Sequence, residues 1–171
     1  MNRRKALKTL AIASGGLITL PFWMGCGTDN RPATHLTSFS STEQKLIAAI
    51  TDMIIPAGDS IGALSMEVDK FLQKLIDDCY TKDVQVNVKK QLAELEASAK
   101  KSEKKSFADC IQSQRQQLLL SFSLSADKQK KDFFDLMRSE TIRGFATSKE
   151  VMEKYLNYKI APGHYFGCVN V

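Results

Sequence analysis

The apolar residues between positions 40 and 160 recur three or four residues apart, which is the spacing of one face of an amphipathic helix. A first helix is expected to open at Ser40 or Ser41, where Glu43 or Gln44 completes a capping box, and to end at Pro56. Its apolar face is a compact stripe formed by Leu46, Ile47, Ile50 and Ile54.

A second helix is predicted because its apolar residues follow the i, i+3, i+4, i+7 spacing and end at Cys79, which is therefore expected to face inward. This stripe is Val68, Phe71, Leu72, Leu75, Ile76 and Cys79. Helical spacing continues through Val84, Val88, Leu92 and Leu95 among lysines and glutamates. The following charged run, 100–105, is expected to be a solvated end.

Three further segments complete the pattern. Phe107, Ile111 and the apolar block 118–122 predict a short turn and then a buried helix. Residues 127–143 predict another helix with Gly144 near its end and an apolar stripe of Phe133, Phe134, Met137 and Ile142. Thr147 and Glu150 form a capping box that is expected to open a last helix through about Tyr158.

No alternating pattern is long enough to predict a sheet, and the segment 161–171 is too irregular for a helix. The expected fold class is therefore all-α. We predict a single compact domain over residues 41–171, with about five to six helices and an irregular C-terminal tail. A chain of this size can bury one core without a second domain.

The segment 1–26 has the layout of a cleavable export leader, with a basic start and then an uncharged stretch from Thr9 through Gly25. It is similar to a twin-arginine (Tat) signal, and the alternative is an ordinary Sec leader. Asn2 and Ala6 depart from the Tat pattern. The residues that match it are Arg3, Arg4, Leu7 and Lys8.

Cys26 directly follows the apolar stretch, at the place where lipoproteins receive a lipid. Lipidation, ordinary cleavage nearby and an uncleaved anchor all remain open. Residues 27–40 are rich in Thr, Ser, Asn and Pro, which predicts a flexible tether between the leader and the helical domain.

The net charge of +5 comes mainly from the leader. Four of the 24 basic residues and no acidic residue lie before Thr9, which leaves 20 basic against 19 acidic residues, or +1, in the rest. A nearly neutral domain lacks the basic surface that phosphate binding requires. We therefore expect no nucleic-acid partner.

The sequence offers no recognisable reaction centre. Four cysteines without Cys-x-x-Cys spacing exclude zinc-ribbon, thioredoxin-like and haem c attachment patterns. If Cys26 carries lipid, three cysteines remain, and any of three pairings is open in an oxidising compartment. His164 has no neighbouring nucleophile or carboxylate, and Asp77 and Asp78 diverge around a helix.

Aromatic residues at Phe133, Phe134 and Tyr155 could line a ligand pocket, but their helical spacing favours the core. We therefore expect no catalytic, cofactor-binding or metal-binding residue in this chain. An exported helical domain of this kind is expected to bind another protein.

Several segments together resemble the gluconate 2-dehydrogenase subunit 3 family. Ile61 stands where these proteins often have proline before the Gly-Ala pair. The similarity lies in Asp52-Met53-Ile54-Ile55-Pro56, Gly62-Ala63, Val68, Phe71, Leu75, the run 133–138, the run 141–145, Thr147-Ser148, Tyr155, Tyr158 and the segment 162–168.

This resemblance implies a non-catalytic small subunit of a periplasmic, membrane-associated dehydrogenase that acts on a sugar or sugar acid. FAD is then expected in a large GMC-type flavoprotein subunit, and a cytochrome c is a candidate electron acceptor. The small subunit would carry the Tat leader for export and assembly of the complex. The alternative is a free-standing exported lipoprotein or a transient export chaperone.

Two structural hypotheses accompany this resemblance. Pro162, Gly163, Tyr165 and Phe166 of the tail are expected to contact the partner, because exposed aromatic side chains on an irregular tail are unfavourable in water. A Cys79–Cys168 disulfide is expected to fix the tail to an early helix and to leave Cys110 free.

Overall fold

The computed structural model describes residues 37–159 together with 161 and 163. These residues contain helices and no strand, so the all-α prediction is confirmed for them. Five α-helices, two 3₁₀-helices and one π-helical turn follow in chain order within this part. They are α2 (Ser41–Ile54), η1 (Ala63–Met66), α3 (Val68–Cys79), α4 (Lys82–Glu103), η2 (Phe107–Asp109), α5 (Gln112–Ser123), α6 (Lys128–Ala146) and η3 (Val151–Tyr155).

The start of α2 is the one that the sequence predicts. Ser40 is the N-cap, and its hydroxyl accepts a hydrogen bond from the Glu43 backbone N–H at 3.3 Å. The Glu43 carboxylate accepts in return from the Ser40 backbone N–H at 2.7 Å. This reciprocal pair satisfies N–H groups that have no partner inside the helix. Helix α2 ends at Ile54, two residues before Pro56.

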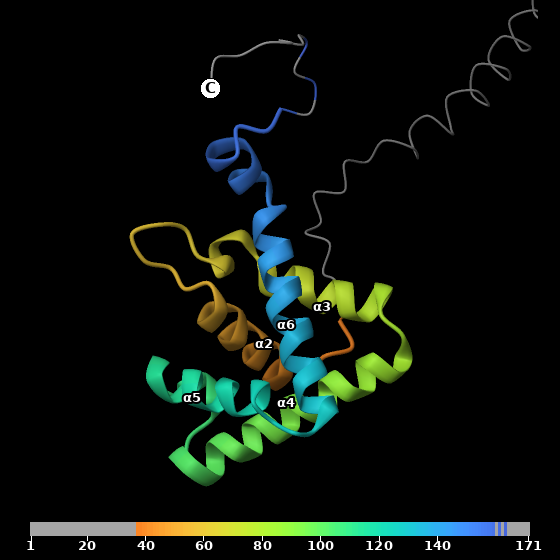
Figure 1. The fold of residues 1–171 in the computed structure, drawn as a ribbon, viewed down its shortest axis with the longest axis vertical. Coiled ribbons are helices and arrows are strands. Elements are labelled where there is room, and N and C mark those ends of the chain that lie inside the picture. Colours follow the sequence, from red (N-terminus) through yellow and green to blue (C-terminus); the bar gives the residue numbers. More distant parts are fainter. Residues whose placement is uncertain (1–36, 160, 162, 164–171) are drawn as a thin grey trace, which may run out of the picture. The chain divides into compact units, whose positions relative to one another are not determined.

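Helix α6 is the central element of the described unit. It contacts α2, α3, α4 and α5, and Figure 1 shows it crossing the other helices. Asp127 caps it by accepting a hydrogen bond from the Gln129 backbone N–H at 2.9 Å. Phe133 and Met137 are each 1% exposed, so they lie on the side of α6 that faces the core. The fully buried side chains around them include Ile47, Ile50, Leu72, Ile76, Leu92, Leu95 and Phe107.

Gly144 lies inside α6 and allows α3 and α6 to pack closely. A Cβ atom at this position would lie 2.7 Å from Phe71 Cδ1 and 3.1 Å from Val68 Cγ1. Gly144 is therefore a packing residue, and α6 continues beyond it to Ala146.

The chain before α2 is fixed to the end of α3. The Asp77 carboxylate accepts hydrogen bonds from the Thr37 hydroxyl at 3.0 Å and from the Ser38 backbone N–H at 2.8 Å. Lys89 donates to the Ser38 carbonyl at 2.9 Å, and Phe39 is 3% exposed. The helical domain thus begins at Thr37, while residues 27–36 of the predicted tether lie outside the described part.

The C-terminal part of the pattern differs from the prediction. Helix α5 was expected to be buried, but only Leu119 and Phe122 are buried and Leu120 is 46% exposed. Ile142 of α6, assigned to the apolar stripe, is also 46% exposed. One side of each of these helices therefore faces solvent in the described unit.

The predicted last helix is a single π-helical turn, η3, without a side-chain cap. Thr147 does not cap it, because the Thr147 hydroxyl donates back to the Arg143 carbonyl at 2.8 Å and closes the end of α6. The threonine of this Thr-x-x-Glu pattern therefore lies at the end of one helix and does not open the next. The pattern alone cannot distinguish this arrangement from a helix start.

Candidate partner-binding surface

Most of the predicted export and interface residues lie outside the described residues. These are Arg3, Arg4, Leu7, Cys26, Pro162, Tyr165, Phe166 and Cys168. Gly163 is described and exposed, with a φ of 73° and no atom within 4 Å of the position that a Cβ would take. This left-handed conformation favours glycine over other residues. The expected contact of the tail with a partner stays a prediction.

The expectation that Cys79 faces inward is wrong, because its side chain is exposed at the last position of α3. The buried side of α3 follows Val68, Leu72 and Ile76, which are spaced by four residues. On the Cys79 side, Phe71 is 39% exposed and Leu75 is half-buried. The apolar stripe is thus wider than the part of the helix that other helices cover.

Cys110 is a buried thiol, 2% exposed, whose S–H donates to the Ser106 carbonyl at 3.3 Å. Burial raises the pKa of Cys110, which keeps the thiol protonated and unreactive. Cys79 and Cys110 are both free thiols in the described part and are not joined to each other. The predicted disulfide between Cys79 and Cys168 remains a prediction.

The most buried carboxylate among the described residues connects α3 and α6. Glu140 is 9% exposed and accepts a hydrogen bond from the Tyr80 hydroxyl at 2.9 Å. Arg143 approaches the second carboxylate oxygen to 2.5 Å, an ion pair without hydrogen-bond geometry. Burial, followed by the bond to Glu140, raises the pKa of Tyr80. These contacts give Glu140 a structural role that joins two helices.

Asp77, one of the two adjacent carboxylates, is also committed to structure. Burial raises its pKa, but the hydrogen bonds from Ser38 and Thr37, with Lys89 nearby, outweigh burial and hold the pKa below its usual value. Within the part of the chain that the structure describes, no three His, Cys, Asp or Glu side chains converge in a way that could hold a metal ion.

No helix among residues 37–159 has the length and apolar character needed to cross a bilayer.

Exposed apolar side chains gather where the described chain ends. Tyr155, Leu156 and Tyr158 are 57%, 59% and 51% exposed, and we call these three residues the C-terminal apolar patch. The prediction that Tyr155 belongs to the core is wrong, whereas Phe133 is buried and Phe134 half-buried. Tyr155 lies in η3, for which α6 is the main described contact, so little of the described chain covers its side chain.

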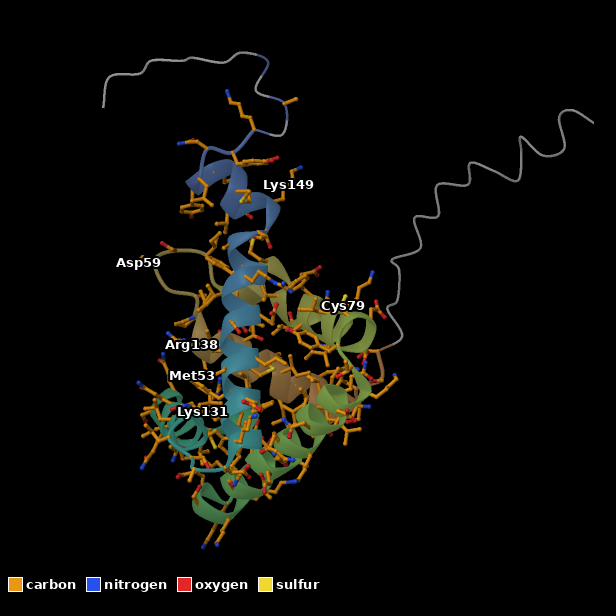
Figure 2. The ribbon with its side chains drawn as sticks, turned by 45° about the vertical axis from the view of Figure 1, so that its right-hand side comes forward. Met53, Asp59, Cys79, Lys131, Arg138 and Lys149 are labelled. Atoms are coloured by element: carbon orange, nitrogen blue, oxygen red, sulfur yellow. The ribbon has the colours of Figure 1, made fainter. Side chains whose placement is uncertain are left out.

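A pocket of about 550 Å³ lies beside this patch and includes Tyr158 in its lining. Figure 2 places Lys149, another lining residue, beyond the end of α6. Thr147, Met152, Glu153 and Lys159 complete the described lining. The volume falls within the range of ligand pockets, about 300–1,000 Å³. Its described lining combines the apolar surface of Met152 and Tyr158 with the charged side chains of Lys149, Glu153 and Lys159.

Comparison with known proteins supplies the identity. A search of curated proteins and a search of solved structures each gave no match to this chain. The family model for gluconate 2-dehydrogenase subunit 3 matches residues 41–163. This range contains all the described helices and most of the chain. The protein therefore belongs to the gluconate 2-dehydrogenase subunit 3 family.

Proposed function

We propose that this protein is the non-catalytic small subunit of a periplasmic, membrane-associated dehydrogenase. Its large subunit would be a GMC-type flavoprotein that holds FAD and oxidises a sugar or a sugar acid, with a cytochrome c as candidate electron acceptor. The family match over residues 41–163 carries this proposal, because it names a subunit of a dehydrogenase. The role of this chain would be the export, assembly and stability of the flavoprotein.

The hydrogen bonds of two carboxylates, Asp77 and Glu140, support a binding role over a catalytic one. The Asp77 carboxylate holds the N-terminal segment, and the Glu140 carboxylate joins α3 to α6. A general acid or base must instead be able to reach a substrate proton. The C-terminal apolar patch adds exposed tyrosines, a residue type that is enriched in protein interfaces.

The leader would serve both subunits. The Tat pathway carries folded proteins, so a flavoprotein that has bound FAD in the cytoplasm could cross together with this chain. Only one of the two polypeptides then needs Arg3 and Arg4.

Lipid at Cys26 would keep the assembled complex at the membrane. The segment 27–36 links Cys26 to Thr37, which Asp77 fixes to α3. Ten residues span at most about 35 Å when fully extended. The α3 end of the domain would therefore remain near the bilayer surface.

Co-purification tests this function. The full-length chain, tagged at its C-terminus and expressed in its own host, is isolated from the periplasmic and membrane fractions. We expect a flavoprotein in a fixed ratio to this chain and dehydrogenase activity toward a sugar or sugar acid. A transient chaperone or a free-standing lipoprotein would instead be recovered without flavin, and that result would contradict a permanent subunit.

A further inference from the structure

A small groove lies where α2, α5 and α6 meet, apart from the C-terminal apolar patch. Its volume is about 210 Å³. Five apolar side chains and one arginine form most of its lining: Met53, Ile54, Leu119, Leu120, Phe134 and Arg138. Figure 2 shows Met53 and Arg138 on the same side of the described unit.

The size of the groove suits an inserted side chain. Pockets that hold cofactors or drug-sized molecules begin at about 300 Å³, which is larger than this groove. Leu120 is 46% exposed, and Met53 and Phe134 are half-buried. An apolar side chain of a partner placed here would remove its own apolar surface and that of the groove from water, which favours binding.

The apolar surface continues along α6. Ile142, 46% exposed, lies four residues after Arg138 and therefore on the same face of the helix. Ile142 is not a lining residue of the groove, but it extends the exposed apolar surface of α6. It also provides more contact area than the groove alone.

The positive charge at the edge of the groove has no partner within the described chain. Arg138 is exposed and forms no ion pair or hydrogen bond with a described residue, including Asp135 one turn earlier. Lys131, seven residues before Arg138 and on the same face, is also exposed and unpaired there. Figure 2 shows both side chains on α6.

Other cations nearby are paired. Lys130 of α6 lies 3.4 Å from the Glu94 carboxylate, and Arg115 of α5 lies 3.6 Å from Asp52 of α2. The carboxylate of α2 closest in sequence to Met53 is thus already engaged. The groove therefore combines an apolar centre with an arginine that has no direct partner among the described residues.

We propose that this groove binds the flavoprotein subunit, through a segment that inserts one apolar side chain and places an aspartate or glutamate against Arg138. The inference rests on the function proposed above and adds a second contact, separate from the C-terminal apolar patch. Arginine can bind a carboxylate through two parallel hydrogen bonds, which fixes the orientation of the segment. Arginine is one of the residue types enriched among those that dominate interface energy.

A second copy of this chain is a less suitable occupant. A symmetric dimer brings the same patch of each copy together, which places Arg138 and Lys131 of both copies within one interface. Juxtaposed like charges oppose association. A polypeptide with a carboxylate beside an apolar residue avoids this repulsion.

Matched substitutions test the proposal. Leu120→Ser removes an apolar side chain from the lining of the groove, and Arg138→Glu reverses the charge at its edge. Val86→Ser and Lys74→Glu make the same kinds of change at exposed positions of α4 and α3, neither of which lines the groove. Each full-length variant is bound to the flavoprotein that co-purifies with the wild-type chain, and the dissociation constant is measured at low and high salt.

We expect the two groove variants to weaken binding by about tenfold or more and the two controls to bind like the wild type. Arg138→Lys should bind with intermediate strength, because it keeps the charge but loses the two-pronged geometry. Arg138→Ala should also reduce the salt dependence of binding. Equal thermal unfolding of the variants establishes that folding is unchanged.

The outcomes separate the two proposals. If the flavoprotein binds the wild type but the groove variants bind it equally well, the groove proposal is overturned and the proposed function stands. If no flavoprotein accompanies the wild type, both are overturned. A photo-crosslinker at Gln116, another lining residue, should join a flavoprotein peptide with an acidic residue near the crosslink. A crosslink to a second copy or within the same chain would overturn the groove proposal.

Discussion

At the scale of single residues, two contacts restrict which side chains the fold accepts. Gly144 packs closely against Phe71, and the Asp77 carboxylate accepts hydrogen bonds from Thr37 and Ser38. Neither is visible as a motif. A glycine near the end of a helical pattern indicates a cap, and an aspartate next to another aspartate indicates a solvated surface. Each has a different role because of a neighbour that is distant in sequence, and single-residue patterns do not contain that information.

We predict that Gly144→Ala destabilises the protein in spite of the better helix propensity of alanine. The propensity gain is about 1 kcal/mol, whereas forcing a methyl group into packed atoms costs typically 1–3 kcal/mol. The new Cβ would lie 2.7 Å from Phe71 Cδ1. The free energy of unfolding is measured by urea denaturation.

The control is the same substitution in a Phe71→Ala background, where the ring is absent. There, Gly144→Ala should be neutral or stabilising. Equal effects of Gly144→Ala in both backgrounds would show that the ring does not require glycine.

We predict that Asp77→Asn loosens the N-terminal segment in a pH-dependent way. The hydrogen bonds hold the pKa of Asp77 below its usual value, so its contribution to stability is complete above the unfolded-state pKa of about 3.9. That contribution is lost as the pH falls through the lower pKa of the folded state. The difference in stability between wild type and Asp77→Asn should therefore be constant at neutral pH and disappear in acid.

Limited proteolysis before Phe39 provides a second readout, with faster cleavage expected in the variant. Asp59→Asn, at an exposed loop position, is the control and should leave both readouts unchanged. A stability difference that persists below the folded-state pKa would contradict this account.

At the scale of elements, helix starts are predicted well when the signal is local. Ser40 with Glu43 marks the beginning of α2, because both hydrogen bonds of the capping box join residues three apart. The sequence does not specify which part of an apolar stripe is covered. Cys79 and Ile142 belong to such stripes and are nevertheless exposed, because no other described helix covers them.

The same reasoning explains what the sequence reveals of the candidate sites. The tail is noticed because the aromatic residues Tyr165 and Phe166 stand in an irregular segment. The groove is not noticed, because its lining comes from three helices, α2, α5 and α6, and no one of them shows the groove by its own pattern. Only the packing of the three helices brings Met53 next to Arg138.

We predict that Ser40→Ala destabilises the protein by about 1 kcal/mol, the usual cost of losing an N-cap hydroxyl. Its loss leaves the Glu43 backbone N–H without its partner. Thermal unfolding measures the effect, and Thr42→Ala, an exposed change within the same helical turn, is the control. Ser40→Asp should restore most of the stability, since aspartate is an equally good cap. If Ser40→Ala and Thr42→Ala have the same effect, the cap is not important.

At the scale of the whole molecule, the protein has a helical domain, and its predicted attachments lie toward the two ends of the sequence. The leader, Cys26 and most of the tail lie outside the described residues, so their roles depend on the sequence and on the family. The described body adds an N-terminal segment fixed to α3 and two separate apolar surfaces. These features fit a subunit that binds a larger partner.

We predict that the mature protein contains a Cys79–Cys168 disulfide, which would fix the tail to α3. Cys79 is accessible for such a bond, whereas Cys110 is buried. Closing so long a loop would stabilise the fold by about 4 kcal/mol in the chain-entropy model. Peptide mapping by mass spectrometry under non-reducing conditions should find the linked pair and an unmodified Cys110. Alkylation of both Cys79 and Cys168 without reduction would contradict the prediction.

The most direct test of the central claim is the amount of FAD-containing flavoprotein that reaches the periplasm with and without this chain. We expect the flavoprotein to remain in the cytoplasm when this chain is deleted, and also when Arg3 and Arg4 are both replaced by lysine. The wild-type chain supplied in trans should restore export. If the flavoprotein reaches the periplasm in normal amount and with its FAD while this chain is absent, the account is contradicted.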